Sequence, residues 1–335
     1  MSGPMTDASP LLELRNLRID YRTSGGTVQA VQDVTLSVAA GQSVGLVGES
    51  GSGKSTVAAG ILKLLPDNAA ITGGSVAFAG TDLARRSEAE MNRTWRWRQL
   101  ATVFQRSLSA LSPVHRVGDQ LHDVLAMHEP RLGRRERTAR IDGLLQAVHL
   151  PPRVLRAYPF ELSGGMMQRT MIALGLLCNP PFLILDESTT ALDVITQGQI
   201  LREVNRLRQE FDLTLMVISH DVGVINATAH TVAVLYAGQL MEVAPRERFF
   251  SAPSHPYSRA LVTSVPRIGG QSGRLRGIPG ALPDLRHPPA GCRFAPRCPH
   301  AMERCTVAPP PLYEVAPGHV VRCVLFDQYP ERKTV

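Results

Sequence analysis

The segment Gly48–Thr56 reads Gly-Glu-Ser-Gly-Ser-Gly-Lys-Ser-Thr and constrains this chain more than any other. It lies between an apolar run, Val44–Val47, and a run with helical character, Val57–Leu65. In such a loop the glycines let the backbone close around phosphate oxygens, while N–H groups and a helix N-terminus supply partial positive charge. Lys54 is placed to reach the β- and γ-phosphates, and the Ser55 hydroxyl to bind Mg²⁺. The segment predicts an α/β fold with a nucleotide-phosphate site rather than a glycine-rich surface loop.

Length and composition set wide limits on the rest of the chain. With 335 residues and 44% apolar content it can form one large domain with an appendage, or two domains. The net charge of +7 is spread along the sequence, and its densest group, five arginines within residues 131–140, predicts a solvated helix face. Met1–Leu11 lacks the pattern of an export signal, and no segment approaches the ~20 apolar residues of a membrane-spanning helix, so we expect the chain itself to be soluble.

The N-terminal part of the chain has the pattern of strands. Apolar and polar residues roughly alternate over Leu12–Tyr21 and again over Ala30–Val38, with Ser24-Gly25-Gly26 between them. This alternation around a glycine turn predicts a β-hairpin. Beyond the phosphate loop, Ser75–Ala79 has the composition of another strand, which closes at Gly80. We expect an antiparallel β subdomain here.

The middle of the chain changes character twice. Between about Met91 and Leu162 it is rich in Arg, Leu, Gln and His at helical spacings, which predicts a helical insertion. Beyond it, Phe182–Leu185 and Leu213–Ile218 are short apolar runs typical of strands buried on both faces. The helical spacing of Thr196–Phe211 between them completes a predicted βαβ unit.

After Val243 prolines and glycines recur, and regular structure is not expected. We therefore predict a nucleotide-binding domain over residues 10–245, with a helical subdomain at about 91–162, and a loop-rich C-terminal module over 246–335. A module of this composition needs a staple other than a large core.

Three further motifs follow the phosphate loop in the sequence. Asp186 and Glu187 end the apolar strand at Phe182, at the edge where α/β sheets present ligands. Asp186 would hold Mg²⁺ through water, and Glu187 would polarise the water that attacks the γ-phosphate. Leu162-Ser163-Gly164-Gly165-Met166-Met167-Gln168 places a serine at a helix N-cap, with two glycines for close backbone approach. His220 follows the strand at Leu213–Ile218.

Together with Gln105 after Val103-Phe104, and Asp193 after Ala191-Leu192, these motifs occur in the order found in the ATP-binding-cassette (ABC) ATPases. The chain resembles that family over about 170 residues. The resemblance implies an ATPase with the P-loop ABC fold, in which two cassettes face head to tail. Each ATP then lies between one chain's phosphate loop and the other chain's signature segment.

The resemblance also implies a role for each site residue. ATP would be bound by Tyr21, stacking on adenine, and by Gly48, Ser50, Gly51, Ser52, Gly53, Lys54, Ser55, Thr56, Gln105 and Asp186. Mg²⁺ would be held through Ser55, Gln105 and Asp186; Glu187 and His220 would be catalytic; Leu162, Ser163, Gly164, Gly165 and Gln168 would form the signature of the trans site; and Asp193 would communicate across the dimer. For Tyr21 the alternative is an aromatic side chain in the core.

The resemblance narrows at three segments: Gly48–Ser55, Ser188–Val194 and His255-Pro256-Tyr257. These look like the ATPases of the dipeptide, oligopeptide and nickel importers, whose C-terminal extension this chain shares. That branch implies an ATPase coupled to import, peripheral on the cytoplasmic face of the inner membrane. Its partners would be two transmembrane permease subunits, a second and different cassette, and an extracytoplasmic binding protein. Di- or oligopeptides are the favoured cargo, with nickel or another small solute as the alternative.

Four of the five cysteines lie within the C-terminal module, at Cys292, Cys298, Cys305 and Cys323. A phosphate-loop protein without an export signal works in a reducing compartment, where clustered cysteines more often hold metal than form disulfides. Zinc and a 4Fe-4S cluster both accept four sulfurs, and spacing alone does not separate them. Because some members of the resembled family carry a 4Fe-4S cluster here, we favour iron-sulfur over zinc, and a metal-free cluster of reduced cysteines is the remaining alternative. Cys178 is expected in the core.

The chain departs from the family pattern at Ser188, where proline is common, at Arg106, where aspartate is common, and at Ser112, where asparagine is common. None of these positions supplies a phosphate or magnesium ligand.

Two other functions remain as alternatives: an ABC ATPase that acts on nucleic acid, and an inactive regulatory cassette. The first lacks the expected coiled-coil insertion, and the second is at odds with a complete set of catalytic residues.

Overall fold

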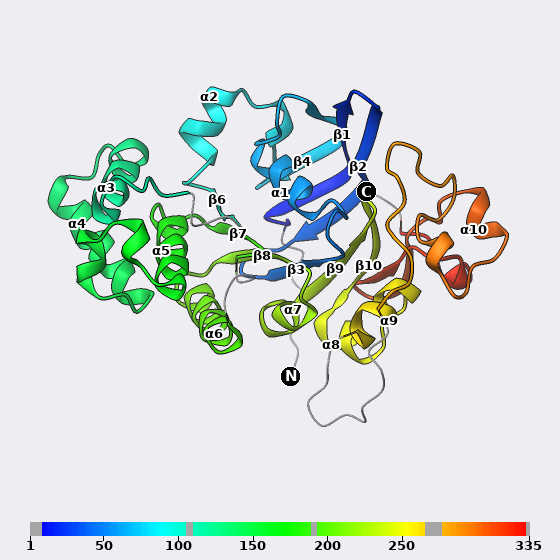
Figure 1. Cartoon of the computed structure of the whole chain (residues 1–335). Helices are drawn as coiled ribbons and strands as arrows, with labels where there is room; N and C mark the ends of the chain where they lie inside the picture. The colour runs from blue at the N-terminus through cyan, green and yellow to red at the C-terminus, as the bar shows by residue number, and fades with distance from the viewer. Residues whose placement is uncertain (1–8, 105–109, 189–192, 265–276, 333–335) are drawn as a thin grey trace. The chain divides into compact units, whose positions relative to one another are not determined.

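The computed structural model describes residues 9–104, 110–188, 193–264 and 277–332. They divide into two compact units. Unit 1 takes its residues from 1–39, 43–85 and 218–335, and unit 2 from 40–42 and 86–217 (Figure 1). None of the described helices is both long enough and apolar enough to cross a membrane.

Unit 1 contains two groups of strands. Its elements are β1 (Leu12–Thr23), β2 (Gly26–Val38), β3 (Ser43–Val47), α1 (Lys54–Leu62), β4 (Ala69–Phe78), β5 (Thr81–Asp82), the 3-10 turn η1 (Leu83–Arg85), α7 (Val222–Thr228), β9 (Thr231–Tyr236), β10 (Gln239–Pro245), α8 (Arg246–Ser251), α9 (Pro256–Thr263), η6 (Ala295–Arg297), α10 (Arg304–Val307), β11 (Tyr313–Ala316), β12 (His319–Val321) and η7 (Val324–Phe326). One sheet has the order β2-β1-β4-β5, and the other strands of this unit follow the order β11-β12-β10-β9-β3.

The predicted N-terminal hairpin is confirmed, with longer strands than expected. β1 and β2 pair in antiparallel register down to Thr23 and Gly26, and β4 pairs with the other edge of β1. The alternation of apolar and polar residues predicts these strands correctly because one face of the sheet is buried. Leu12, Leu14 and Leu17 on β1 are completely inaccessible to solvent. This sheet is the expected antiparallel β subdomain, and β1 and β2 can be followed in dark blue in Figure 1.

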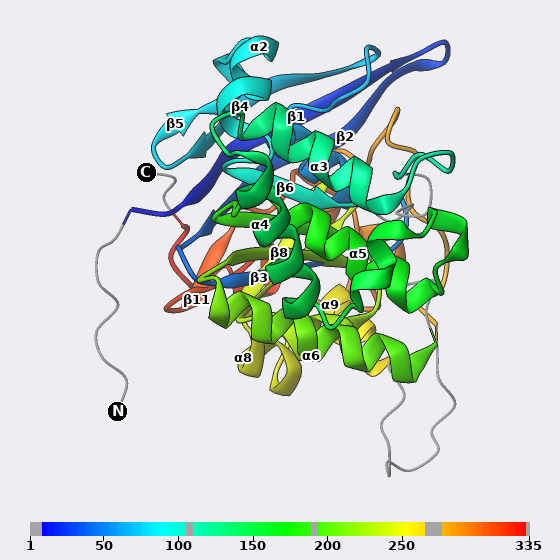
Figure 2. The ribbon, with the colours of Figure 1, turned by 90° about the vertical axis from the view of Figure 1, so that its left-hand side faces the viewer.

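Unit 2 combines three strands with a helical layer. Its elements are α2 (Glu88–Glu90), the π-turn η2 (Met91–Trp95), β6 (Leu100–Val103), α3 (Val117–His128), α4 (Arg134–Ala147), the 3-10 turns η4 (Pro152–Arg156) and η5 (Pro159–Glu161), α5 (Gly164–Leu176), β7 (Phe182–Asp186), α6 (Val194–Glu210) and β8 (Thr214–Ser219). The strands follow the order β8-β7-β6, and β6 runs parallel to β7. Figure 2 shows the helices α3, α4, α5 and α6 of this unit.

The predicted βαβ unit is confirmed as β7, α6 and β8, each within two residues of its expected bounds. The expectation of a continuous helical insertion from about Met91 was wrong at one point, because Leu100–Val103 is strand β6. Leu100 and Val103 are buried, and this short apolar run gains a full ladder of backbone bonds with β7. The helical spacings in the neighbouring sequence mask so short a strand.

The expectation that residues after Val243 lack regular structure was also wrong. β12 pairs with β10, and β11 pairs with β12, so the C-terminal extension adds two strands to the sheet of unit 1. Helix α9 begins at Pro256, and the His255 imidazole accepts a hydrogen bond from the Tyr257 N–H at 3.0 Å to cap it. A proline at the first helical position is compatible with a helix, because its missing N–H would have no partner there.

A buried carboxylate joins the extension to the core of unit 1. Glu242 on β10 is completely inaccessible, and its oxygens accept hydrogen bonds from the N–H groups of Ser254 and His255, each at 2.8 Å. His319 on β12 contacts the same carboxylate at 2.8 Å. Burial alone would raise the pKa of Glu242, but the bonds from His319, Ser254 and His255 outweigh it and lower the pKa.

Replacing Glu242 with glutamine is expected to lower the free energy of unfolding by about 3 kcal/mol, because an amide cannot accept at both positions and one buried donor loses its partner. Urea denaturation of the purified chain measures this. Because the folded pKa lies below the unfolded value of 4.5, the contribution is complete above pH 4.5 and disappears as the pH falls through the folded pKa. Glu247→Gln, at an exposed ion pair with Arg246, is the matched control and should change little. Equal stability of both variants would contradict the assignment.

Candidate nucleotide-binding and hydrolysis site

The phosphate loop connects β3 to α1 within unit 1. Its path requires glycine at both ends. A Cβ atom on Gly48 would lie 2.0 Å from the Leu235 carbonyl oxygen, and one on Gly53 would lie 2.5 Å from that of Ala30. Gly53 also has a φ of 101°, which favours glycine. The turn therefore closes tightly against β2 and β9, and α1 begins directly after it at Lys54.

The side chain of Lys54, the first residue of α1, reaches back into this loop. This side chain is buried, and its ammonium donates hydrogen bonds to the carbonyl oxygens of Gly48 at 2.8 Å and Glu49 at 2.9 Å. The charge is thus held inside the curve of the loop. Ser50 and Ser55 are exposed, whereas Ser52 is completely buried. Ser52 is bound through its backbone, because its carbonyl oxygen accepts a hydrogen bond from the Gly238 N–H at 2.9 Å.

Tyr21 lies beside the start of α1. Its hydroxyl is 3.3 Å from the Thr56 hydroxyl, and the residue is half-buried rather than part of the core. A half-buried aromatic side chain next to the phosphate loop is compatible with a stacking role. His220, also in unit 1, follows β8 and is exposed, and Asp221 caps α7 by accepting a hydrogen bond from the Gly223 N–H at 2.7 Å. The cap fixes the turn that carries His220.

The two predicted acids lie at the carboxyl end of β7 in unit 2. Asp186 is buried at the end of the strand, and Glu187 is half-buried. Glu187 has a φ of 47°, a left-handed conformation that is uncommon for a residue with a side chain. Such strained conformations concentrate at functional sites, where surrounding structure enforces them. Gln105 and the Ala191-Leu192 pair lie outside the described residues.

The signature segment and Asp193 line one cleft in unit 2. Ser163 caps α5 by accepting a hydrogen bond from the Met166 N–H at 3.4 Å, and Asp193 caps α6 by accepting from Ile195 and Thr196, each at 3.0 Å. Hydrogen bonds from Thr196, then Ile195, lower the pKa of Asp193. The cleft is lined by His149, Leu150, Pro151, Ser163, Gly164, Gly165, Met166, Arg169, Asp193, Thr196 and Gln199. Two helix N-termini opening into one cleft favour an anion.

Gln168 does not line this cleft, although the sequence predicted it as part of the signature. It is buried on the inner side of α5, and Met166 and Arg169 face the cleft instead. The helical period explains the difference, because positions 166 and 169 are three residues apart and share a face, whereas 168 points elsewhere. Leu162 is half-buried at the end of η5, next to the Ser163 cap.

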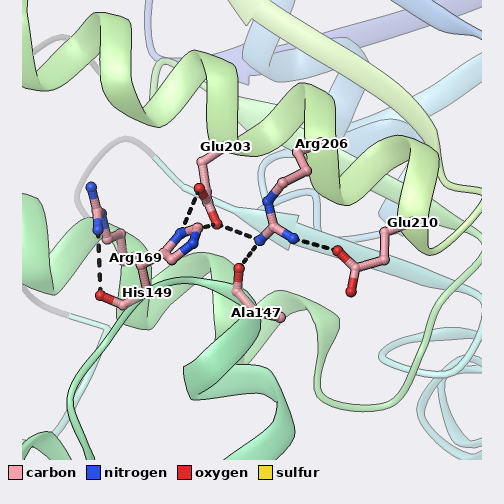
Figure 3. Close-up of polar contacts among 6 residues, drawn as sticks. All are labelled: Ala147, His149, Arg169, Glu203, Arg206 and Glu210. Carbon is pink, nitrogen blue, oxygen red and sulfur yellow. Dashed lines mark hydrogen bonds and ion pairs between the residues drawn. The ribbon is translucent and has the colours of Figure 1, made fainter.

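A polar network links residues of the helices that carry the cleft, and Figure 3 shows six of its members. Glu203 of α6 accepts hydrogen bonds from His149 Nδ1 at 2.9 Å and from Arg206 at 2.7 Å. The His149 carbonyl oxygen accepts a bond from Arg169 of α5 at 3.4 Å. Arg206 also bonds the Ala147 carbonyl oxygen at the end of α4. No local pattern in the sequence marks His149, because its partner Glu203 is 54 residues away.

Glu203→Gln is expected to lower the free energy of unfolding by about 1–3 kcal/mol, because it removes a buried carboxylate that serves both His149 and Arg206. Urea denaturation measures the loss. Glu210→Gln is the matched control, since Glu210 binds the same arginine from an exposed position and should contribute little. A larger effect for Glu210→Gln than for Glu203→Gln would contradict this account of the network.

The four clustered cysteines line one pocket in unit 1. Cys292, Cys298, Cys305 and Cys323 surround it together with His255, His300 and apolar side chains such as Phe294. The Cys292 N–H donates to the Cys305 carbonyl oxygen at 2.8 Å, which brings these two segments together. Burial raises the pKa of Cys292, Cys298 and Cys323, the last to about 11. Across the described ranges, no three His, Cys, Asp or Glu side chains are arranged to hold a metal ion. Cys178 is buried, as predicted.

Comparisons with known proteins agree with this geometry. A family model described as ABC transporter matches residues 31–190, and one described as oligopeptide/dipeptide transporter, C-terminal region, matches residues 241–305. The chain is 43% identical to the oligopeptide transport ATP-binding protein OppD of Salmonella typhimurium, over 94% of each chain. It is 44% identical to a probable peptide ABC transporter ATP-binding protein of Sinorhizobium fredii, over 96% of each chain.

A solved structure gives the same result for the fold. The dimeric ATP-binding cassette MJ0796, in a post-hydrolysis state bound to ADP and Pi, superposes with a TM-score of 0.63 and 26% identity. The match covers 70% of this chain and 98% of that one. The phosphate loop, the two acids at the end of β7 and the signature segment all lie within residues 31–190, which the ABC transporter family model matches. The chain belongs to the ABC transporter family of ATP-hydrolysing proteins, in the branch that carries the oligopeptide/dipeptide transporter C-terminal region.

Proposed function

We propose that this chain powers the import of di- or oligopeptides into a bacterial cell by hydrolysing ATP. The observation that carries the proposal is the match along nearly the whole chain, including the C-terminal extension, to relatives named for oligopeptide transport. The phosphate loop with its buried Lys54 supplies the chemistry that such a subunit needs. The extension sets this branch apart from cassettes in general.

Each site residue has a proposed role in ATP hydrolysis. Gly48, Ser50, Gly51, Ser52, Gly53, Lys54 and Thr56 hold the phosphates, and Tyr21 stacks on the adenine. Ser55, Gln105 and Asp186 hold Mg²⁺, which neutralises phosphate charge when it is bound. Glu187 takes the proton from the attacking water, and His220 contacts the γ-phosphate. The cleft of Ser163, Gly164 and Gly165, with Leu162 and Gln168 supporting its helix, meets the ATP of a second cassette, and Asp193 links the two sites.

In the proposed assembly, each ATP is bound between two cassettes. A second cassette, different from this chain, completes each site, and two permease subunits carry the cargo across the membrane. An extracytoplasmic binding protein delivers the peptide. The chain works at the cytoplasmic face of the inner membrane, and its nucleotide-binding domain (residues 10–245) hydrolyses ATP while residues 246–335 form the extension. Nucleic acid is not an expected partner.

The cysteine pocket is the proposed site of a 4Fe-4S cluster, with zinc as the alternative. The support for this site is chemical: four thiols line one largely apolar pocket, although no three of them are arranged to hold a metal ion in the described residues. Burial disfavours the charged form of Cys292, Cys298 and Cys323 unless a cation compensates it. Cys292, Cys298, Cys305 and Cys323 would hold the group and tie together segments that have only a small core. Its contribution would be structural.

Metal and sulfide analysis of chain purified without oxygen tests this assignment. Four iron atoms with four acid-labile sulfides per chain support the cluster, whereas one zinc atom without sulfide supports the alternative. Cys323→Ser should lower the bound metal and the free energy of unfolding. Cys178→Ser, at a buried cysteine outside the pocket, is the control and should leave the metal content unchanged.

Uptake in cells tests the proposed cargo. Labelled dipeptides, longer peptides and Ni²⁺ are compared in cells lacking this chain and in cells restored with wild type or Glu187→Gln. Peptide uptake that returns only with wild type supports the proposal. If wild type restored uptake of Ni²⁺ alone, the proposed cargo would be a metal ion instead of a peptide. If cells lacking this chain took up every solute as well as cells that contain it, import of these cargoes would be refuted.

A further inference from the structure

Two side chains of the C-terminal extension contact Glu49 in the phosphate loop. The Glu49 backbone N–H donates a hydrogen bond to the Tyr257 hydroxyl at 2.9 Å, and the Glu49 carboxylate pairs with Arg297 at 2.9 Å. The Glu49 carbonyl oxygen, in turn, accepts hydrogen bonds from Lys54 at 2.9 Å and from the Ser52 N–H at 3.1 Å. Glu49 is therefore held by the extension on one side and holds the lysine on the other.

Several hydrogen bonds hold the buried Arg297 side chain beside Glu49. This arginine side chain is only 5% exposed, whereas a free surface arginine would be solvated. Besides Glu49, its guanidinium donates to the carbonyl oxygens of Ile278 at 3.0 Å and Pro279 at 2.7 Å. It also contacts the Tyr236 hydroxyl at 3.3 Å. A planar fork with fixed donors fits several acceptors at once, which a lysine cannot do.

Tyr257 is equally fixed. It is completely buried, and its ring packs edge-on against Tyr236, with centroids 4.7 Å apart, and in a tilted arrangement against Phe294, with centroids 5.3 Å apart. His255 sets the start of the helix that carries it. The motif His255-Pro256-Tyr257 thus delivers one hydroxyl to the phosphate loop. Phe294 and Arg297 both lie between Cys292 and Cys298, so the cysteine-bearing segment forms part of the same support.

From these contacts we infer that Tyr257 and Arg297 of the extension are positioning residues for ATP binding, acting through Glu49 on Lys54 and the phosphate loop. A loop held in its binding conformation before ATP arrives loses less conformational freedom on binding, so affinity rises without any new contact to the nucleotide. The inference rests on the proposed phosphate site and is independent of the cargo. Neither residue touches the nucleotide in this role.

Two measurements test the inference on the full-length chain and the assembled transporter. Binding of a fluorescent ATP analogue to the chain gives Kd, and hydrolysis by the transporter gives KM and kcat. Arg297→Met should weaken binding about tenfold, and Tyr257→Phe about three- to tenfold, since a charged and a neutral hydrogen bond are lost. KM should rise in step while kcat at saturating ATP changes less than twofold, because the support acts before chemistry. Arg297→Lys should fall between wild type and Arg297→Met.

Matched variants keep the outcome decisive. Glu49→Gln removes the charge of the other partner in the Glu49–Arg297 ion pair. Adding it to Arg297→Met should cause little further loss of ATP affinity if the two residues act together. Arg286→Met removes an exposed arginine of the extension that pairs with Asp284, and it should bind ATP as wild type does. Unchanged Kd and KM in Arg297→Met, Tyr257→Phe and Glu49→Gln, or a loss of kcat alone, would overturn the inference. Unchanged binding in Lys54→Gln would instead overturn the phosphate site itself.

Discussion

ATP hydrolysis at this site is expected to fall by about two to four orders of magnitude in Glu187→Gln, while ATP still binds. Glu187 follows the buried Asp186 at the end of β7 and is held in a left-handed conformation. A carboxylate in this position can take a proton from water, whereas the isosteric amide cannot. The substitution leaves the phosphate loop and its lysine untouched. Phosphate release by the assembled transporter measures the rate of hydrolysis. Nucleotide retention by the variant measures whether ATP still binds.

Glu314→Gln provides the control for this experiment. Glu314 is exposed on β11 in the extension, and the same chemical change there should leave turnover unaltered. If the assembled transporter kept full turnover with Glu187→Gln, hydrolysis would take place in the other composite site. The chain would then act as a regulatory cassette that binds ATP.

ATP affinity is expected to fall about 100-fold in Lys54→Gln. The Lys54 ammonium is buried inside the phosphate loop, where it donates hydrogen bonds to the carbonyl oxygens of Gly48 and Glu49. In the proposed role it is the charge that binds the phosphates of ATP. Two or more charge-assisted hydrogen bonds to phosphate are lost with it, each of about 1.5 kcal/mol or more. Equilibrium binding of a fluorescent ATP analogue to the full-length chain measures the change.

Lys63→Gln is the matched control, because Lys63 lies at the other end of the same helix, α1. Its affinity for ATP should remain close to wild type. A similar loss in both variants would indicate damage to α1 as a whole. Retained affinity in Lys54→Gln would show that the loop does not bind the phosphates.

Much of the site could be predicted because its signals are local. The phosphate loop needs glycines and a lysine within nine consecutive residues, and β3 and α1 lie directly on either side of it. The acids at the end of β7 and the cap at Ser163 are likewise set by neighbouring residues. Short-range periodicity failed where two signals overlapped, as at β6, whose four residues lie within a sequence of helical character.

Long-range packing decided what the local pattern left open. The sequence placed Gln168 in the signature, yet burial of that side chain turns Met166 and Arg169 towards the cleft, and only the packed helix shows which face is covered. The extension looked irregular because its prolines and glycines disrupt periodicity, although β12 gains its ladder from β10, an element far earlier in the chain.

The sequence by itself determined the fold family, the phosphate loop and the acids at the strand end, because each depends on residue types at fixed short spacings. Only the tertiary structure brought Tyr257 and Arg297 to Glu49, across 208 and 248 residues of chain. It also buried the Glu242 carboxylate among Ser254, His255 and His319. Such contacts form when distant elements pack and exclude water, and burial then strengthens hydrogen bonds that carry no local signature in the sequence.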